Sequence, residues 1–210
     1  MHLPQQDHYE VAIRRAQEFL RTKDPLERSL KSGTFYRPET RQIEIPFLRR
    51  TALLQWPEMI LTWQEGNPVE LREQILILHY LQTAQGTPLT GEWIGFAQIP
   101  GGEFYVGPFR QRSVSRFVQA FEKHPEKIVP AAEALGGWPA RFGDVSVTFP
   151  VFPRVPITFV FWQGDEEIAP SGNVLFDSSI PAYLPIEDIT VVCSILTSWL
   201  CRSLQTDKPA

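Results

Sequence analysis

The chain has 210 residues, of which 43% are hydrophobic and 21% are charged. This composition is typical of a globular protein and excludes the disordered class. The formal net charge of −4 argues against nonspecific binding to nucleic acid or to an anionic membrane surface. No apolar run approaches the length of a membrane-spanning helix. Residues 1–7 lack the layout of a signal peptide, so we expect a cytoplasmic protein.

Two helices are expected in the N-terminal region 1–33, which should pack on the main domain. The first, over residues 8–21, should be capped by Asp7 and should bury Ala12, Ala16, Phe19 and Leu20. The second should begin after Asp24, with Pro25 at its first position, and end at Gly33.

Residues 34–204 are predicted to form a single α+β domain, in which helices pack on antiparallel sheet. Short strands are expected at residues 34–36, 42–45 and 59–63. The clearest helix in the chain should span residues 68–85, with Asn67 as its cap. Its second half is apolar almost all round, which predicts that it is buried on most sides.

The remainder of this domain begins with a glycine- and proline-rich segment, residues 86–107, where a hairpin of residues 93–96 and 104–106 is expected. Val145, Val147 and Phe149 alternate as in a half-buried strand. Further elements are predicted as helices at 114–122 and 125–135, strands at 157–162 and 173–176, and a last helix from Pro185. Residues 205–210 should be a flexible tail.

The two cysteines, Cys193 and Cys201, are eight residues apart in the predicted last helix. At a rise of about 1.5 Å per residue they lie roughly 12 Å apart, too far for a disulfide bond. Alone they also cannot hold a structural zinc or an iron–sulfur cluster. We therefore expect both to be small buried hydrophobic residues, and no metal site is predicted.

Several short motifs occur in a characteristic order, including Leu78-His79-Tyr80-Leu81, Gly91-Glu92-Trp93 and Leu175-Phe176-Asp177. With this order the chain resembles, over roughly residues 34–199, a bacterial family known as domain of unknown function three-seven-eight-six. The family has no assigned activity and defines no catalytic residue. Some relatives are fused to a four-cysteine iron–sulfur module similar to that of corrinoid proteins in anaerobes. This chain has no such module, so the resemblance implies a redox or corrinoid role only by analogy.

His79 lies in the most apolar predicted helix. It could be an axial ligand to the metal of a tetrapyrrole, or a general base in a pocket. The alternative is a core histidine whose ring nitrogens are satisfied by a backbone carbonyl or a carboxylate. We favour this alternative, because a single histidine is not a site.

Carboxylates that follow predicted strands are a second group of candidates. Asp144 and Asp165 each follow a glycine, which favours a role in turns over cation binding or acid–base catalysis. Asp177 directly follows an apolar strand. It could cap the Ser-Ser loop at 178–179 or pair with a buried cation such as Arg72 or Arg154.

The glycine-rich segment carries several aromatic residues, among them Trp93 and Tyr105. They could form the wall of a pocket for a flat ligand, or pack a hairpin on a helix. The packing role is favoured.

Taken together, these features predict a protein that binds a small molecule or cofactor, with a tetrapyrrole or corrinoid as the specific candidate. The pocket is predicted to be lined by His79, Trp93, Tyr105 and Asp177. The first alternative is a hydrolase or lyase that uses carboxylates with His79 as its base. The second is an accessory protein without a small-molecule site, marked by a large exposed apolar patch. The ligand and the oligomeric state stay open.

Overall fold

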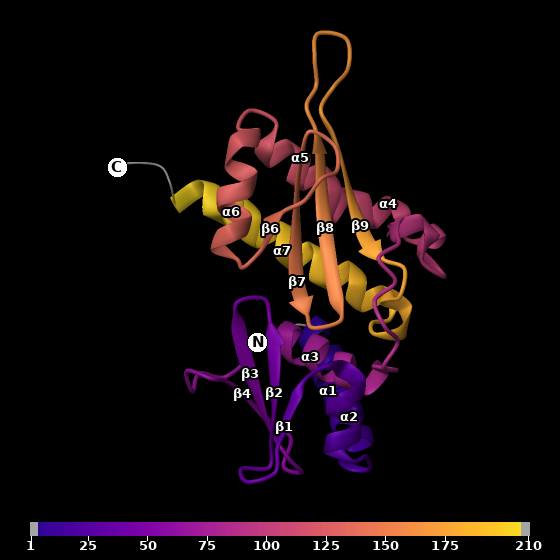
Figure 1. Cartoon of the computed structure of the whole chain (residues 1–210), viewed down its shortest axis with the longest axis vertical. Helices are drawn as coiled ribbons and strands as arrows, with labels where there is room; N and C mark the ends of the chain where they lie inside the picture. The colour runs from indigo at the N-terminus through magenta and orange to yellow at the C-terminus, as the bar shows by residue number, and fades with distance from the viewer. Residues whose placement is uncertain (1–3, 207–210) are drawn as a thin grey trace. The chain divides into compact units, whose positions relative to one another are not determined.

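The structure is a computed structural model that describes residues 4–206, with side chains for residues 9–204 (Figure 1). Its contacts gather into two compact units. The first comprises residues 1–88, 152–154 and 182–185, and the second residues 89–151, 155–181 and 186–210. The end of the first segment, Pro88, falls inside the predicted single domain 34–204, and the domain boundaries stay predictions.

The α+β class is confirmed, because each unit combines helices with an antiparallel sheet. The first unit contains α1 (Pro4–Arg21), α2 (Pro25–Ser32), β1 (Phe35–Arg37), β2 (Gln42–Phe47), β3 (Arg50–Gln55), β4 (Ile60–Trp63) and α3 (Leu71–Thr83). The second contains β5 (Trp93–Gly95), α4 (Val106–Phe109), a π-helical turn (Arg110–Val114), α5 (Ser115–Phe121), α6 (Ile128–Ala134), β6 (Trp138–Pro139), β7 (Val145–Phe152), β8 (Val155–Trp162), β9 (Ser171–Asp177) and α7 (Ile186–Thr206).

The sheet of the first unit has the order β1-β2-β3-β4, with antiparallel neighbours. Alternate residues of β2, namely Ile43, Ile45 and Phe47, are fully buried and form one wall of the core. β3 was not predicted, because Arg50-Thr51-Ala52-Leu53-Leu54-Gln55 lacks the β-branched run that marks a strand. Its pairing with β2 decides its structure, and pairing is not visible in local sequence.

Helix α1 begins at Pro4, four residues before the predicted start, so Asp7 lies inside the helix. Ala16 and Leu20 are buried as predicted. The predicted burial of Phe19 is wrong, since its side chain is 37% exposed and carries the Lys23 ammonium group 4.7 Å from the ring centre. The buried face of α1 instead runs through Ile13, Ala16 and Leu20, and position 19 lies outside this face.

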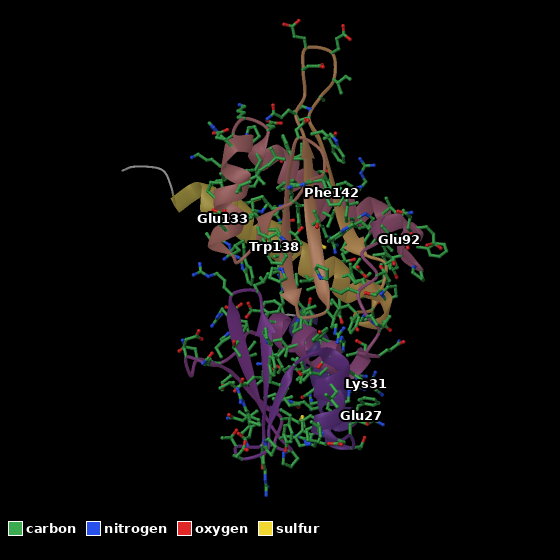
Figure 2. The ribbon with its side chains drawn as sticks, in the orientation of Figure 1. Glu27, Lys31, Glu92, Glu133, Trp138 and Phe142 are labelled. Carbon is green, nitrogen blue, oxygen red and sulfur yellow. The ribbon has the colours of Figure 1, made fainter. Side chains whose placement is uncertain are left out.

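Helix α2 has both predicted ends. The Asp24 side chain accepts a hydrogen bond from the Leu26 amide at 3.0 Å, and Gly33 closes the helix with φ of 70°. On the solvent side, Glu27 and Lys31 form an ion pair at 2.6 Å (Figure 2). Local sequence therefore sets this short helix almost completely.

Helix α3 is shorter than predicted, since it starts at Leu71 and ends at Thr83. Asn67 does not cap it. The Asn67 carbonyl accepts a hydrogen bond from the Trp63 amide at 2.8 Å, and Pro68 forms a bridge with Thr62. The segment before the helix thus extends the sheet, which outweighs the local capping signal.

The second unit has a five-stranded sheet in the order β5-β9-β8-β7-β6, with α5 and α7 on one face (Figure 1). Phe117 of α5 packs its ring against Phe159 and Phe161 of β8, at 5.2 and 6.1 Å between ring centres. The predicted hairpin of residues 93–96 and 104–106 is wrong. β5 pairs with β9, where Ile94 lies opposite the buried Phe176, and Phe104 precedes the short helix α4.

Two smaller predictions for this unit also need correction. β7 is buried on both faces rather than one. The hydroxyl of Thr148 can be buried because it forms a hydrogen bond with Thr158 of β8 at 2.7 Å instead of with water. The predicted tail at 205–210 begins too early, since α7 continues to Thr206. Residues 207–210 lie outside the described part of the chain.

Candidate functional site

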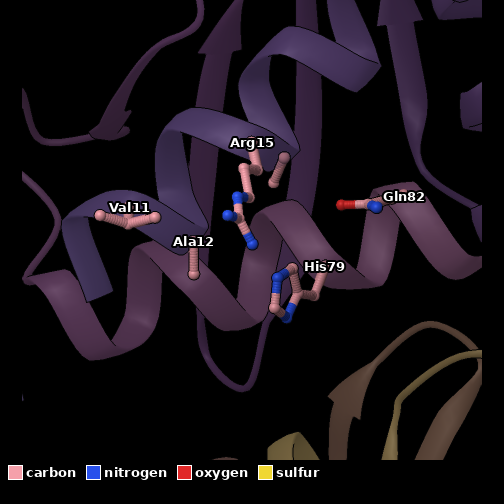
Figure 3. A pocket seen from close by; sticks show the side chains of 6 residues that line it. Val11, Ala12, Arg15, His79 and Gln82 are labelled. Atoms are coloured by element: carbon pink, nitrogen blue, oxygen red, sulfur yellow. The ribbon is translucent and has the colours of Figure 1, made fainter. Parts of the chain in front are cut away.

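An open hollow of about 450 Å³ lies between α1 and α3 in the first unit (Figure 3). It is lined by Val11, Ala12, Arg15, Ala16, His79 and Gln82. The α1 residues fall on one face because they repeat at a spacing of four, and His79 and Gln82 share a face of α3 because they are three apart. Two alanines on α1 leave the space that larger side chains would fill.

Two nitrogen-rich side chains approach each other across this hollow. Arg15 reaches from α1 and His79 from α3, with the guanidinium and imidazole groups turned toward one another (Figure 3). Arg15 is exposed and His79 is half-buried. The guanidinium gives the hollow a permanent positive charge and five hydrogen-bond donors in a planar array.

Gln82 contributes the third polar group. Its side-chain amide oxygen is buried and has no hydrogen-bond partner among the described residues. Its backbone carbonyl, in contrast, accepts a hydrogen bond from Arg28 Nη2 at 3.2 Å. A buried acceptor without a partner is rare in folded proteins and asks for an explanation.

The end of α3 that carries Gln82 is held by the buried side chain of Arg28 on α2. Its guanidinium also donates to the carbonyl oxygens of Leu81 at 2.8 Å and Ala84 at 2.6 Å. These carbonyls belong to the helix terminus, where no intrahelical donor is available and the helix dipole favours a cation. Burial lowers the pKa of Arg28, which still stays charged because its ordinary value is so high.

Tyr80, the neighbour of His79, anchors the opposite face of α3. Its ring stacks on Phe152 with 4.2 Å between ring centres and an interplanar angle of 7°. Its hydroxyl donates to the Ser32 carbonyl and accepts from the Arg154 amide. Burial raises the pKa of Tyr80, so the hydroxyl keeps its proton. These contacts hold α3 against the core, so the side of the hollow that α3 forms is held in place.

Asp177, a predicted pocket residue, serves as a cap in the second unit. Its carboxylate accepts hydrogen bonds from the amides of Thr90, Gly91 and Ser179 and from the hydroxyls of Thr90 and Ser179. Burial raises the pKa of Asp177, but the hydrogen bonds from Ser179, Thr90 and Gly91 outweigh this effect and hold the pKa below its ordinary value. Of the two roles expected for Asp177, the hydrogen bonds from Ser179 confirm the cap of the Ser-Ser loop.

Trp93 lies directly opposite Asp177 in the pairing of β5 with β9, so the structure brings these two predicted residues together. The Trp93 ring is half-buried and packs edge-on against Phe142 at 5.8 Å between ring centres. Tyr105, 45% exposed, precedes α4. His79 belongs to the first unit and the other three residues to the second. A pocket shared by all four stays a prediction.

Of the other predicted carboxylates, Asp165 acts in a turn as expected, whereas Asp144 does not bond within a turn but to a residue 19 positions later. Asp144 accepts from the Gln163 amide at 2.7 Å, and Asp165 accepts from the amides of Glu167 and Ile168. Among the described residues, no group of three or more histidine, cysteine or acidic side chains could hold a metal ion. Cys193 is buried and Cys201 half-buried, and both are free thiols.

Arg15 and Gln82 were missed as site residues. The signal in the sequence is weak, because an arginine in an amphipathic helix usually lies on the solvent face. Ala12 and Ala16 on either side of Arg15 are the one local hint, since small residues at this spacing allow two helices to approach closely.

None of the described helices is both long and apolar enough to span a membrane. Neither the curated proteins nor the solved structures gave a match to the chain. One family matched, described as Domain of unknown function (DUF3786), over residues 24–199. This range begins at the Asp24 cap of α2 and ends in α7, and so covers most of the chain. The chain therefore belongs to the DUF3786 family.

Proposed function

We propose that this protein is a cytoplasmic small-molecule-binding protein whose ligand occupies the hollow between α1 and α3. The observation that carries the proposal is the make-up of the hollow. Its volume of about 450 Å³ falls within the range of roughly 300–1,000 Å³ that is usual for ligand sites. Apolar side chains line it together with three polar groups, Arg15, His79 and Gln82, and such a mixture both binds and orients a ligand.

A tetrapyrrole or corrinoid is the specific candidate within this class. His79 would hold the metal of such a group, and Arg15 would bind one of its carboxylates. The lining does not favour the face of a macrocycle, because the six residues include no phenylalanine, tyrosine or tryptophan on which it could stack. We therefore propose the wider class of small molecules.

Protein purified without oxygen and studied by native mass spectrometry and absorption spectroscopy tests the proposal. A bound mass is expected. If the ligand is a tetrapyrrole held by His79, a visible band is also expected, and His79→Ala should shift or abolish that band. A bound mass without a visible band would keep the proposal and remove the tetrapyrrole. Protein that neither copurifies with a ligand nor binds one from a cell extract would contradict it.

The enzyme alternative, a hydrolase or lyase, needs a carboxylate that works with His79. The six residues that line the hollow include none, so the geometry favours binding over acid–base chemistry. Turnover of an ester or hydroxy acid that is lost in His79→Ala would reverse this preference.

The accessory alternative is favoured by one feature of the second unit. Phe104 is 81% exposed and its neighbour Tyr105 is 45% exposed, and adjacent exposed aromatic side chains are common at protein interfaces. If this pair joins two copies of the chain, sedimentation should show a dimer that Phe104→Ser dissociates.

A further inference from the structure

The unpaired amide oxygen of Gln82 indicates what kind of group a ligand in the hollow would carry. This oxygen is buried, lacks a hydrogen-bond partner among the described residues, and belongs to a residue that lines the hollow. A buried acceptor in this position costs free energy unless a donor reaches it. A hydroxyl or N–H group of a bound molecule would supply that donor once the Gln82 side chain turns its oxygen toward the hollow, since the oxygen is otherwise covered.

The positive charge of Arg15 favours a ligand with a negative charge. Its guanidinium extends into the hollow from α1 (Figure 3), and it has no hydrogen bond or ion pair with any side chain that the structure describes. A planar guanidinium matches the two oxygens of a carboxylate, and this charge-assisted pairing is among the stronger hydrogen-bonded contacts.

The wall between these polar groups suits an apolar body. Val11 and Ala12 lie beside Arg15 in Figure 3, and Ala16 completes this wall with a side chain that is only 1% exposed. Small aliphatic side chains give a shallow surface on which a ring or branched chain can pack.

We propose that the hollow binds an organic carboxylate that carries a hydroxyl or N–H donor beside an apolar body. Arg15 binds the carboxylate, Gln82 Oε1 accepts the hydrogen bond from the donor, and the apolar body packs on Val11, Ala12 and Ala16. This inference rests on the proposed small-molecule function and adds the chemical class of the ligand.

Three related probes separate the contributions of the two polar residues. Mandelate carries a carboxylate, a hydroxyl and an apolar ring. Phenylacetate lacks the hydroxyl, and methyl mandelate lacks the charge. Titration of the full chain by NMR should show mandelate binding most tightly and methyl mandelate least, with shifts concentrated on the amides of α1 and α3.

Variants then assign each contact. Arg15→Gln should weaken mandelate binding by about tenfold or more, because a charge-assisted contact is lost. Arg14→Gln is the matched control, since Arg14 is exposed on the same helix and does not line the hollow. Gln82→Leu should lower the affinity for mandelate to that for phenylacetate. Gln85→Leu, just beyond the helix, should change neither of these two affinities.

The outcomes also separate this inference from the proposed function. Ala12→Trp should fill the hollow and abolish binding of every probe. If Ala12→Trp abolishes binding but Arg15→Gln does not weaken it, the hollow is a binding site and the ligand class is wrong. Equal binding of mandelate and methyl mandelate, or no binding of mandelate, also overturns the class. If Ala12→Trp leaves binding unchanged, the site itself is wrong.

Discussion

Arg28 and Asp177 are buried charged side chains that satisfy backbone groups, and no ion pair with a described side chain is among their contacts. Arg28 donates to three carbonyl oxygens at the end of α3, and Asp177 accepts from three backbone amides and two hydroxyls. Each charge replaces the water that its backbone partners would otherwise need. Both residues should therefore matter for stability.

Asp177→Asn should lower the free energy of unfolding at pH 7 by about 1–3 kcal/mol, because the amide nitrogen cannot accept the hydrogen bonds that the carboxylate accepts. The folded-state pKa of Asp177 is depressed. The stabilisation is therefore complete above the unfolded-state pKa, about 3.9, and is lost as the pH falls through the folded-state pKa. Urea unfolding at pH 7 and at lower pH should show the difference between variant and wild type shrinking in acid.

Asp165→Asn is the control for this prediction, since Asp165 caps an exposed turn. It should change the unfolding curve little. An effect of Asp177→Asn as small as that of the control would show that the cap does not contribute to the free energy of unfolding.

Arg28→Met should lower the free energy of unfolding by roughly 3 kcal/mol, because it leaves buried carbonyl groups at the end of α3 without a donor. Arg14→Met, on the exposed face of α1, should stay within about 0.5 kcal/mol of wild type. Chemical denaturation monitored by circular dichroism measures both. Equal effects of the two substitutions would refute the capping role of Arg28.

At the scale of elements, signals that act within a few residues predicted the structure well. Asp24, Pro25 and Gly33 define both ends of α2, because a cap depends only on the next turn of the helix. The start of α3 and the partner of β5 could not be predicted this way. Asn67 has the sequence of a cap but is used by the sheet, and β5 pairs with a strand about 80 residues later in the chain.

Gly33→Ala should destabilise the protein by about 1 kcal/mol, because φ of 70° is unfavourable for alanine. The added Cβ would also lie 3.2 Å from Arg154 Nε and 3.3 Å from Pro153 Cβ, which increases the cost. Gly107→Ala in α4 is the control, since a Cβ there meets nothing within 4 Å. Thermal unfolding should show a lower midpoint for Gly33→Ala alone, and an equal shift for both would contradict this account.

At the scale of the whole molecule, periodicity and turn residues predicted the α+β class, but the candidate site was only partly predictable. His79 was identified by its contrast with an apolar helix, and it lines the hollow. Arg15 and Gln82 were not identified, because their role depends on how α1 packs on α3. The position of Asp177 after an apolar strand predicts a site residue, but its carboxylate accepts hydrogen bonds from the neighbouring loops.

The native mass of the purified protein tests the central claim, that the hollow between α1 and α3 holds a small molecule. Wild type should carry a bound mass that Ala12→Trp lacks, because the larger side chain occupies the hollow. Arg14→Trp, which adds the same side chain outside the hollow, should retain the bound mass. A mass retained by Ala12→Trp would place the ligand elsewhere, and the account of this site would then be wrong.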